Sequence, residues 1–127
     1  MNKTQNVRRP IADSIATLHA AGIMVVGGFI IGTGADFDVL ALAVQSDDKL
    51  YIGGAFTNFN GTNRLGIARL NANGSLDLAF DPGTGANDVV RALAILPNGQ
   101  VLIGGDFPDY NGTNVGRLAR LNADGTY

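Results

Sequence analysis

Two aromatic residues flanked by amides are the side chains best suited to bind a ligand in this sequence. Phe59 and Tyr110 lie 51 residues apart, and each is followed by Asn-Gly-Thr-Asn. A ring can stack on the apolar face of a sugar, and amides can hydrogen-bond its hydroxyls. Alternatively, each ring packs against the protein and Asn-Gly serves only as a turn. The candidate ligand-binding residues are Phe59, Asn60, Asn63, Tyr110, Asn111 and Asn114.

Arg69 and Arg120 also recur 51 residues apart. Guanidinium groups gathered at one end of a repeat protein could hold a carboxylate or a phosphate. The alternatives are a structural ion pair with Asp77 or Asp81, or arginine stems packed along the repeat. We expect a structural role.

The run from Asn71 to Asp77 places oxygen-bearing side chains at the spacing of a calcium-binding loop. However, Arg69 stands two residues before Asn71, where such loops have an acid, and Arg120 takes the same place in the second copy. We therefore expect an ordinary β-turn and predict no metal site.

Residue types for catalysis are scarce. His19 is the single histidine, and Cys and Glu are absent. No Gly-x-Ser-x-Gly elbow occurs, and Gly32-Thr33-Gly34 lacks the lysine of a phosphate-binding loop. We predict no catalytic residues, no cofactor and no enzyme activity. An enzyme whose site forms between chains is the weaker alternative.

Composition narrows the possible partners. The net charge of −2 is too small, and of the wrong sign, for general binding to nucleic acid or anionic membranes. No apolar run reaches the length of a membrane span. The 18 glycines, and acids that are all aspartate, favour turns and strands over helices.

The elements that carry these residues form a repeat. With an offset of 51, 22 of 45 aligned positions are identical, and repeats of this period indicate stacked or ring-forming units. The first strand of each copy is apolar on both faces, with large residues on one face and small residues on the other. We therefore expect both faces to be buried. The paired glycines at 53–54 and 104–105 indicate a bulge or a close backbone approach. The expected strands are 39–45, 50–52, 67–70 and 75–80 in the first copy and 89–96, 100–103 and 117–121 in the second, with long loops at 55–63 and 106–114.

The domain organisation follows as a single all-β domain of repeated antiparallel blades. Repeat 1 spans 32–82 and repeat 2 spans 83–127. Residues 11–31 align as a degenerate half repeat, although a short helix over 10–21 is the alternative. Residues 1–10 form a polar tail that could anchor the chain to a larger partner. About two and a half units cannot close a ring of roughly four to eight blades, so we expect a homo-oligomer, with a trimer favoured.

The repeated pattern resembles the delta-60 repeat, a β-propeller-like family associated with bacteria and phages. The resemblance covers about residues 32–127 and implies propeller blades without an established catalytic set. Members are typically long surface or secreted arrays. The residues that carry it are Ala92-Leu93-Ala94, Asn98-Gly99, Ile103-Gly104-Gly105-Asp106-Phe107, Asn111-Gly112-Thr113 and Arg117-Leu118-Ala119-Arg120-Leu121-Asn122-Ala123-Asp124-Gly125.

These observations together favour a non-enzymatic structural or assembly module. The resemblance points to a virion component, such as a capsid decoration, head fibre or tail protein, or to a bacterial surface component. The location expected is therefore a virion or an extracellular surface. The alternative is a lectin-like module that reads glycans through the loops at 55–63 and 106–114.

Overall fold

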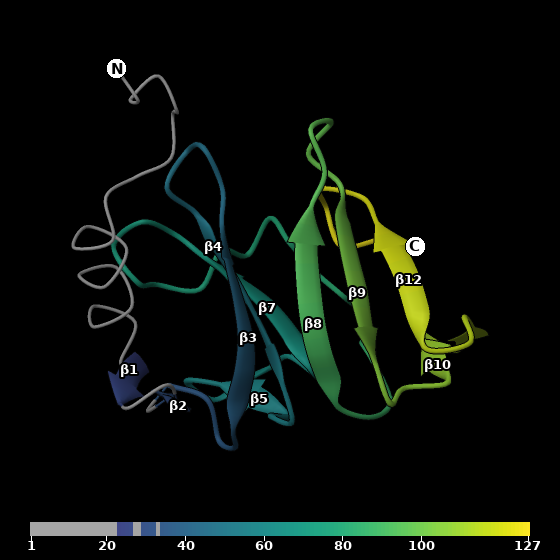
Figure 1. Ribbon diagram of the computed structural model, residues 1–127, viewed down its shortest axis with the longest axis horizontal. Coiled ribbons are helices and arrows are strands. Elements are labelled where there is room, and N and C mark those ends of the chain that lie inside the picture. Colours follow the sequence, from purple (N-terminus) through teal and green to yellow (C-terminus); the bar gives the residue numbers. More distant parts are fainter. Residues whose placement is uncertain (1–22, 27–28, 33) are drawn as a thin grey trace.

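Apolar residues alternate with turns rich in Gly, Asn and Asp, and every regular element in the described residues is a strand, as predicted. The computed structural model describes residues 23–26, 29–32 and 34–127, with side-chain burial from residue 34 onward. All strand pairs are antiparallel (Figure 1). Over this part of the chain no helix has the length and hydropathy to cross a bilayer.

Ten of the strands form two units with the same order of elements. Each strand of unit 2 begins 51 residues after its counterpart in unit 1. Unit 1 contains β3 (Val39–Val44), β4 (Leu50–Gly54), β5 (Asn58–Phe59), β6 (Thr62–Asn63) and β7 (Ile67–Leu70). Unit 2 contains β8 (Val90–Ile95), β9 (Val101–Gly105), β10 (Asp109–Tyr110), β11 (Thr113–Asn114) and β12 (Leu118–Leu121).

Each unit is a three-stranded sheet with a small hairpin beside it. The sheets have the orders β3-β4-β7 and β12-β9-β8, and the hairpins are β5-β6 and β10-β11. The two sheets lie next to each other, with β3 beside β8 (Figure 1). This arrangement brings one face of unit 1 against one face of unit 2.

The turns use the residues that positive φ requires. Asp48 and Gly99 occupy equivalent hairpin turns with φ of 73° and 86°. Asn60 and Asn111 have φ of 49° and 50°, and a glycine at 83° or 80° follows each. Positive φ at these positions is what the tight turns of β-hairpins require. The loops expected at 55–63 and 106–114 therefore contain the hairpins β5-β6 and β10-β11, and Asn-Gly acts as the turn former.

The paired glycines mark both a bulge and a close approach, as predicted. The register of β3 on β4 shifts between Val39 and Ala41, and that of β8 on β9 shifts between Val90 and Ala92. A Cβ on Gly54 would overlap the backbone carbonyl oxygen of Asp38, so the two backbone segments approach closely here. A side chain cannot be fitted at this position without moving the backbone.

The strand predicted at 75–80 is absent, and this prediction was wrong. Only Leu76 pairs, in an isolated bridge with Leu70. The chain turns immediately afterwards: the carboxylate of Asp77 accepts a hydrogen bond from the Ala79 amide at 3.0 Å, and the Asp77 carbonyl accepts one from Phe80 at 3.3 Å. A residue that caps a turn cannot continue a strand.

Each sheet has two faces. The forward face is the one on the side of the next unit along the chain, and the back face is the one on the side of the preceding unit. The forward face of unit 1 looks toward unit 2 and consists of Ala41, Ala43, Tyr51, Gly53, Ile67 and Arg69, which are cross-strand partners. The back face of unit 2 looks toward unit 1 and consists of Leu93, Ile95, Val101, Ile103, Ala119 and Leu121. The forward face of unit 2 consists of Ala92, Ala94, Leu102, Gly104, Leu118 and Arg120.

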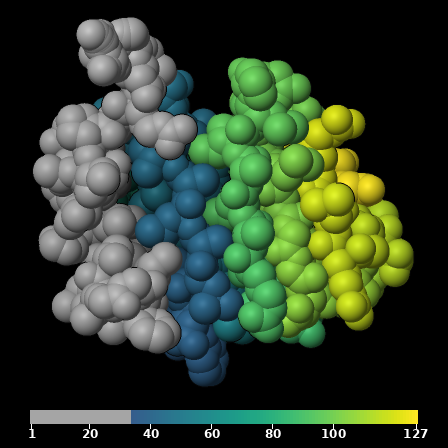
Figure 2. Space-filling model, viewed as in Figure 1, coloured from purple at the N-terminus to yellow at the C-terminus, as the bar shows by residue number. Residues whose placement is uncertain are grey.

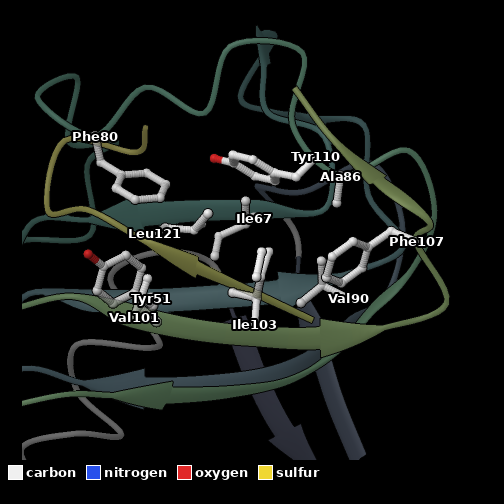
Figure 3. Close-up of a cluster of buried hydrophobic side chains, with 11 residues drawn as sticks. Tyr51, Ile67, Phe80, Ala86, Val90, Val101, Ile103, Phe107, Tyr110 and Leu121 are labelled. Carbon is white, nitrogen blue, oxygen red and sulfur yellow. The ribbon is translucent and has the colours of Figure 1, made fainter. Parts of the chain in front are cut away.

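Two clusters of buried side chains fill the molecule. Among the residues with described side chains, the unit 1 core consists of residues of unit 1 and of the segment before it: Ala35, Val39, Leu50, Ile52, Phe56, Phe59, Ala68 and Leu70. The junction core takes residues from both units and the connection between them (Figure 3): Tyr51, Ile67, Phe80, Ala86, Val90, Val101, Ile103, Phe107, Tyr110, Ala119 and Leu121.

The expectation that the first strands are buried on both faces was wrong. In β8, Arg91, Ala92 and Ala94 are exposed, and in β3 Leu40 is 42% exposed. The strands buried along their whole length are instead β4 and β7. β4 is the middle strand of its sheet, and unit 2 covers the forward face of unit 1.

The leading strands β1 (Ile23–Val26) and β2 (Phe29–Gly32) form an antiparallel pair, and β2 lies against β3. Their register pairs Ile23 with Gly32 and Val26 with Phe29. The half repeat predicted over 11–31 placed a turn at Gly22 before a strand that ends at Gly27-Gly28. A strand is present at Ile23–Val26, and the predicted turn lies outside the described residues. The polar tail at 1–10 and the choice between strand and helix over 11–21 lie outside the described residues.

Candidate functional site

The two aromatic rings proposed to stack on sugars are buried. Phe59 and Tyr110 are each 0% exposed. Phe59 pairs with Ala35, and its ring lies over Gly34, where a Cβ would come within 2.5 Å of Phe59 Cζ. Tyr110 points into the junction core (Figure 3), and its hydroxyl donates to the Gly125 carbonyl at 2.6 Å. Burial raises the pKa of Tyr110. Sugar stacking would need these rings exposed, and the structure instead shows the alternative, in which each ring packs against the protein.

The four asparagines of the predicted site remain on the surface. Asn60 and Asn111 occupy the hairpin turns, while Asn63 and Asn114 are exposed one strand later. Asn111 Oδ1 accepts hydrogen bonds from the amide and hydroxyl of Thr84 at 3.0 and 3.2 Å. Binding by these amides stays a prediction, now without an aromatic platform beside them.

Asp36 ties the start of unit 1 to its small hairpin. Its carboxylate accepts hydrogen bonds from the amides of Thr57 at 2.7 Å and Asn58 at 3.0 Å, and from the Thr57 hydroxyl. These bonds, that of the Asn58 amide first, lower the pKa of Asp36 to about 2. Asn87 takes the equivalent place in unit 2 and accepts from the Asp109 amide at 2.9 Å. An acid exchanged for an amide between the two copies indicates a structural role.

A buried polar cluster surrounds Arg69. Arg69 Nε donates to Asp77 Oδ2 at 2.8 Å, and Lys49 Nζ donates to the same oxygen at 2.7 Å. Burial alone would raise the pKa of Asp77, but the hydrogen bonds from Lys49, the Ala79 amide and Arg69 lower it overall. The ion pair expected between Arg69 and an aspartate is thus confirmed, and Asp77 is its partner.

This geometry also accounts for the calcium-like run. Asp77 is already held by two cations, and Asn73 Oδ1 accepts from the amide and hydroxyl of Ser75 at 3.0 and 2.6 Å. The amide of Gly74 closes the turn on the Asn71 carbonyl at 2.9 Å. The run is the β-turn that we expected. Over the described residues, no three His, Cys, Asp or Glu side chains gather as a metal site would need.

Arg69 also joins the two units. Its guanidinium lies 5.7 Å from the ring centre of Tyr51 and 5.3 Å from that of Phe80, within the range of cation–π attraction. The two rings meet edge to face at 5.2 Å. Arg69 Nη1 then donates to the carbonyl of Ala123, in the last turn of unit 2, at 2.7 Å. Arg69 therefore forms a buried contact that holds the two units together.

The equivalent arginine of unit 2 is in a different environment. Arg120 is exposed, whereas only 7% of Arg69 is exposed. Arg120 lines a groove of about 470 Å³ together with Gln100, Leu102, Leu118, Asn122 and Tyr127. Sequence reasoning treated the two arginines alike, because their neighbours in the chain match. The difference arises because unit 2 covers the forward face of unit 1.

Comparison with known families agrees with this architecture. The chain matches the family model described as a domain of unknown function (DUF5122), beta-propeller, over residues 45–80 and 96–126, more than half of its length. The chain belongs to this β-propeller family. The two matched segments of the DUF5122 model begin 51 residues apart, at equivalent positions of units 1 and 2. No curated protein and no solved structure matches the chain.

Proposed function

We propose that this DUF5122 chain is a non-enzymatic building module whose repeats serve to join units into a larger assembly. One observation carries the proposal: the aromatic and ionic groups most suited to chemistry are engaged in packing one unit on the next. Arg69, Tyr51, Phe80 and Tyr110 all lie within the contact between the units. Groups engaged in this way hold the fold together and are not presented to a substrate.

The setting that we propose is a phage particle or a bacterial surface. A capsid decoration, head fibre or tail protein is the form that a small repeat module would take there. The support comes from the resemblance of the repeat to phage-associated and surface arrays, and from membership of a β-propeller family. A propeller is a rigid scaffold that hosts many functions, so the fold alone does not select a ligand.

Glycan binding is less well supported than assembly. A lectin site would need a stacking surface, and the rings of Phe59 and Tyr110 are 0% exposed. The asparagines of the candidate site are exposed, but the two rings that were to provide the stacking surface are not. A role in catalysis likewise finds no support in the Arg69 cluster, where the carboxylate of Asp77 is already bound by two cations.

The assembly proposed is a homotrimer, because three chains would supply roughly six to eight blade equivalents, the usual range of a closed propeller. Light scattering on a sizing column tests it. We expect a mass close to three times the 13.2 kDa of one chain. A mass of one chain at every protein concentration would overturn the proposal, because a module that joins units must associate.

A further inference from the structure

Strands β7 and β12 have nearly the same sequence but different burial. Ile67, Ala68, Arg69 and Leu70 of β7 are all buried. In β12, Ala119 and Leu121 are buried, but Leu118 and Arg120 are exposed. Leu118 is 61% exposed, whereas its counterpart Ile67 is 0% exposed. The forward face is therefore covered in unit 1 and open in unit 2.

The glycines of the two forward faces show the same contrast. A Cβ on Gly53 would lie 2.8 Å from Val90 Cγ1, so unit 2 packs directly onto this glycine. For Gly104, the nearest atoms to such a Cβ are 3.8 and 3.9 Å away and belong to Arg117 and Leu118 of the same unit. No atom of the described residues fills the space that Val90 fills in unit 1.

The open face lies at the end of the molecule away from β1 and β2, where β12 forms the edge of its sheet (Figure 1). In the space-filling view, the C-terminal part of unit 2 makes up this end of the molecule (Figure 2). Leu118 and Tyr127, which is 58% exposed, add apolar area to the groove that Arg120 lines. Exposed apolar area of this kind, rimmed by polar groups, is characteristic of a protein-binding surface.

We propose that the forward face of unit 2 docks a repeat unit of a second copy of this chain. The inference rests on the proposed assembly function and names its contact surface. The occupant is argued from the contact already present in the molecule: the same face, in the same register, binds a unit of the same repeat inside one chain. Packing on the open face would follow the packing of unit 2 on unit 1.

In this contact Arg120 is the counterpart of Arg69. Arg69 donates to the Ala123 carbonyl in the turn that ends the unit packed on it. Arg120 accordingly donates to a turn carbonyl of the second copy, while Leu102 and Leu118 take the places of Tyr51 and Ile67. A guanidinium that becomes buried in this way needs such an acceptor, because burial without a partner is costly.

The second contact is not identical to the first. Gly66 of unit 1 has φ of 76°, and a Cβ there would lie 3.1 Å from Val90 and 3.2 Å from Ala86 of the connection and unit 2. The equivalent residue is Arg117, which keeps a φ of 75° although it has a side chain. The docked unit must leave room for the Arg117 side chain, so the second contact departs at this corner from the packing of Val90 and Ala86 on Gly66.

The test compares Leu118→Asp with Leu78→Asp by light scattering over a wide range of protein concentration. Both leucines are exposed, at 61% and 71%, but Leu78 lies outside the forward face. We expect Leu118→Asp to abolish the association that the wild type shows, and Leu78→Asp to retain it. Circular dichroism of each variant confirms that it is folded, since neither leucine is buried.

Arg120→Ala gives a second, graded readout. It should raise the dissociation constant about tenfold, the size expected for one hydrogen bond from a charged donor. If Leu118→Asp and Arg120→Ala associate as well as the wild type, this face is not the contact, and the assembly function stands without it. If the wild type itself stays a monomer, both proposals fail. A mass of two chains that Leu118→Asp reduces to one would keep this contact and overturn the trimer.

Discussion

At the scale of single residues, burial decides what a charged group does. Arg69 and Arg91 each pair with an aspartate, at 2.8 and 2.7 Å. The Arg69–Asp77 pair has side chains only 8% and 7% exposed, whereas those of Arg91 and Asp106 are 59% and 46% exposed. Water screens the exposed pair, while removing one partner of the buried pair leaves a charge without compensation.

Asp77→Asn should therefore lower the free energy of unfolding by about 3 kcal/mol, because Arg69 and Lys49 would lose their shared acceptor charge. Asp106→Asn is the matched control, and it should leave stability almost unchanged. Urea unfolding at neutral pH measures both variants. Equal effects of the two substitutions would contradict the role given to Arg69.

The stability difference between wild type and Asp77→Asn depends on pH, because the pKa of Asp77 is lowered in the fold. A carboxyl whose pKa is lower in the folded than in the unfolded state stabilises the fold fully above its ordinary value, 3.8. The stabilisation is lost as the pH falls below that value. The gap between wild type and Asp77→Asn should accordingly be largest at neutral pH and shrink in acid.

At the scale of elements, the sequence predicts most strands, because turn residues with a fixed offset punctuate them. Asp48 and Gly99 lie in the hairpin turns, at the positions where the pattern predicts turns. The sequence pattern does not predict the orientation of Phe59, because a ring between asparagines has the same local pattern whether it faces inward or outward. Gly34, which leaves space for that ring, is the signal that could have predicted its burial.

Neither could the burial of a strand face be predicted, because it depends on which unit lies next to it. The segments Ile67–Leu70 and Leu118–Leu121 differ at one position, yet one is buried throughout and the other alternates. The local pattern determines that both are strands. The neighbouring unit determines whether their forward residues form a core or a surface.

Glycines on the forward faces give a matched test of this difference. Gly53→Ala should cost about 1–3 kcal/mol of stability, because the new methyl group presses on Val90 and must displace it. Gly104→Ala should be tolerated by the single chain, where its Cβ has no close neighbour. Thermal unfolding of dilute samples compares the two, and an equal loss for both would show that unit 2 does not rest on Gly53 as described.

At the scale of the whole molecule, the junction core makes the two units depend on each other. It combines Tyr51 and Ile67 of unit 1 with Val101, Ile103 and Leu121 of unit 2, and Arg69 links to the Ala123 carbonyl across the same contact. Without unit 1, the back face of unit 2 would be exposed to water. Unit 1, by contrast, also has a core of its own around Ile52 and Phe59.

The two units should therefore unfold together, and equivalent isoleucines can show it. Ile52 lies in the unit 1 core and Ile103 in the junction core, and both are 0% exposed. Truncation of either to alanine should cost about 2–5 kcal/mol. Ile103→Ala should reduce hydrogen-exchange protection in β4 as much as in β9, because the lost packing belongs to both units. If protection fell in β9 alone, the units would be separate folding blocks, and a second copy docking on unit 2 would add nothing to the stability of unit 1.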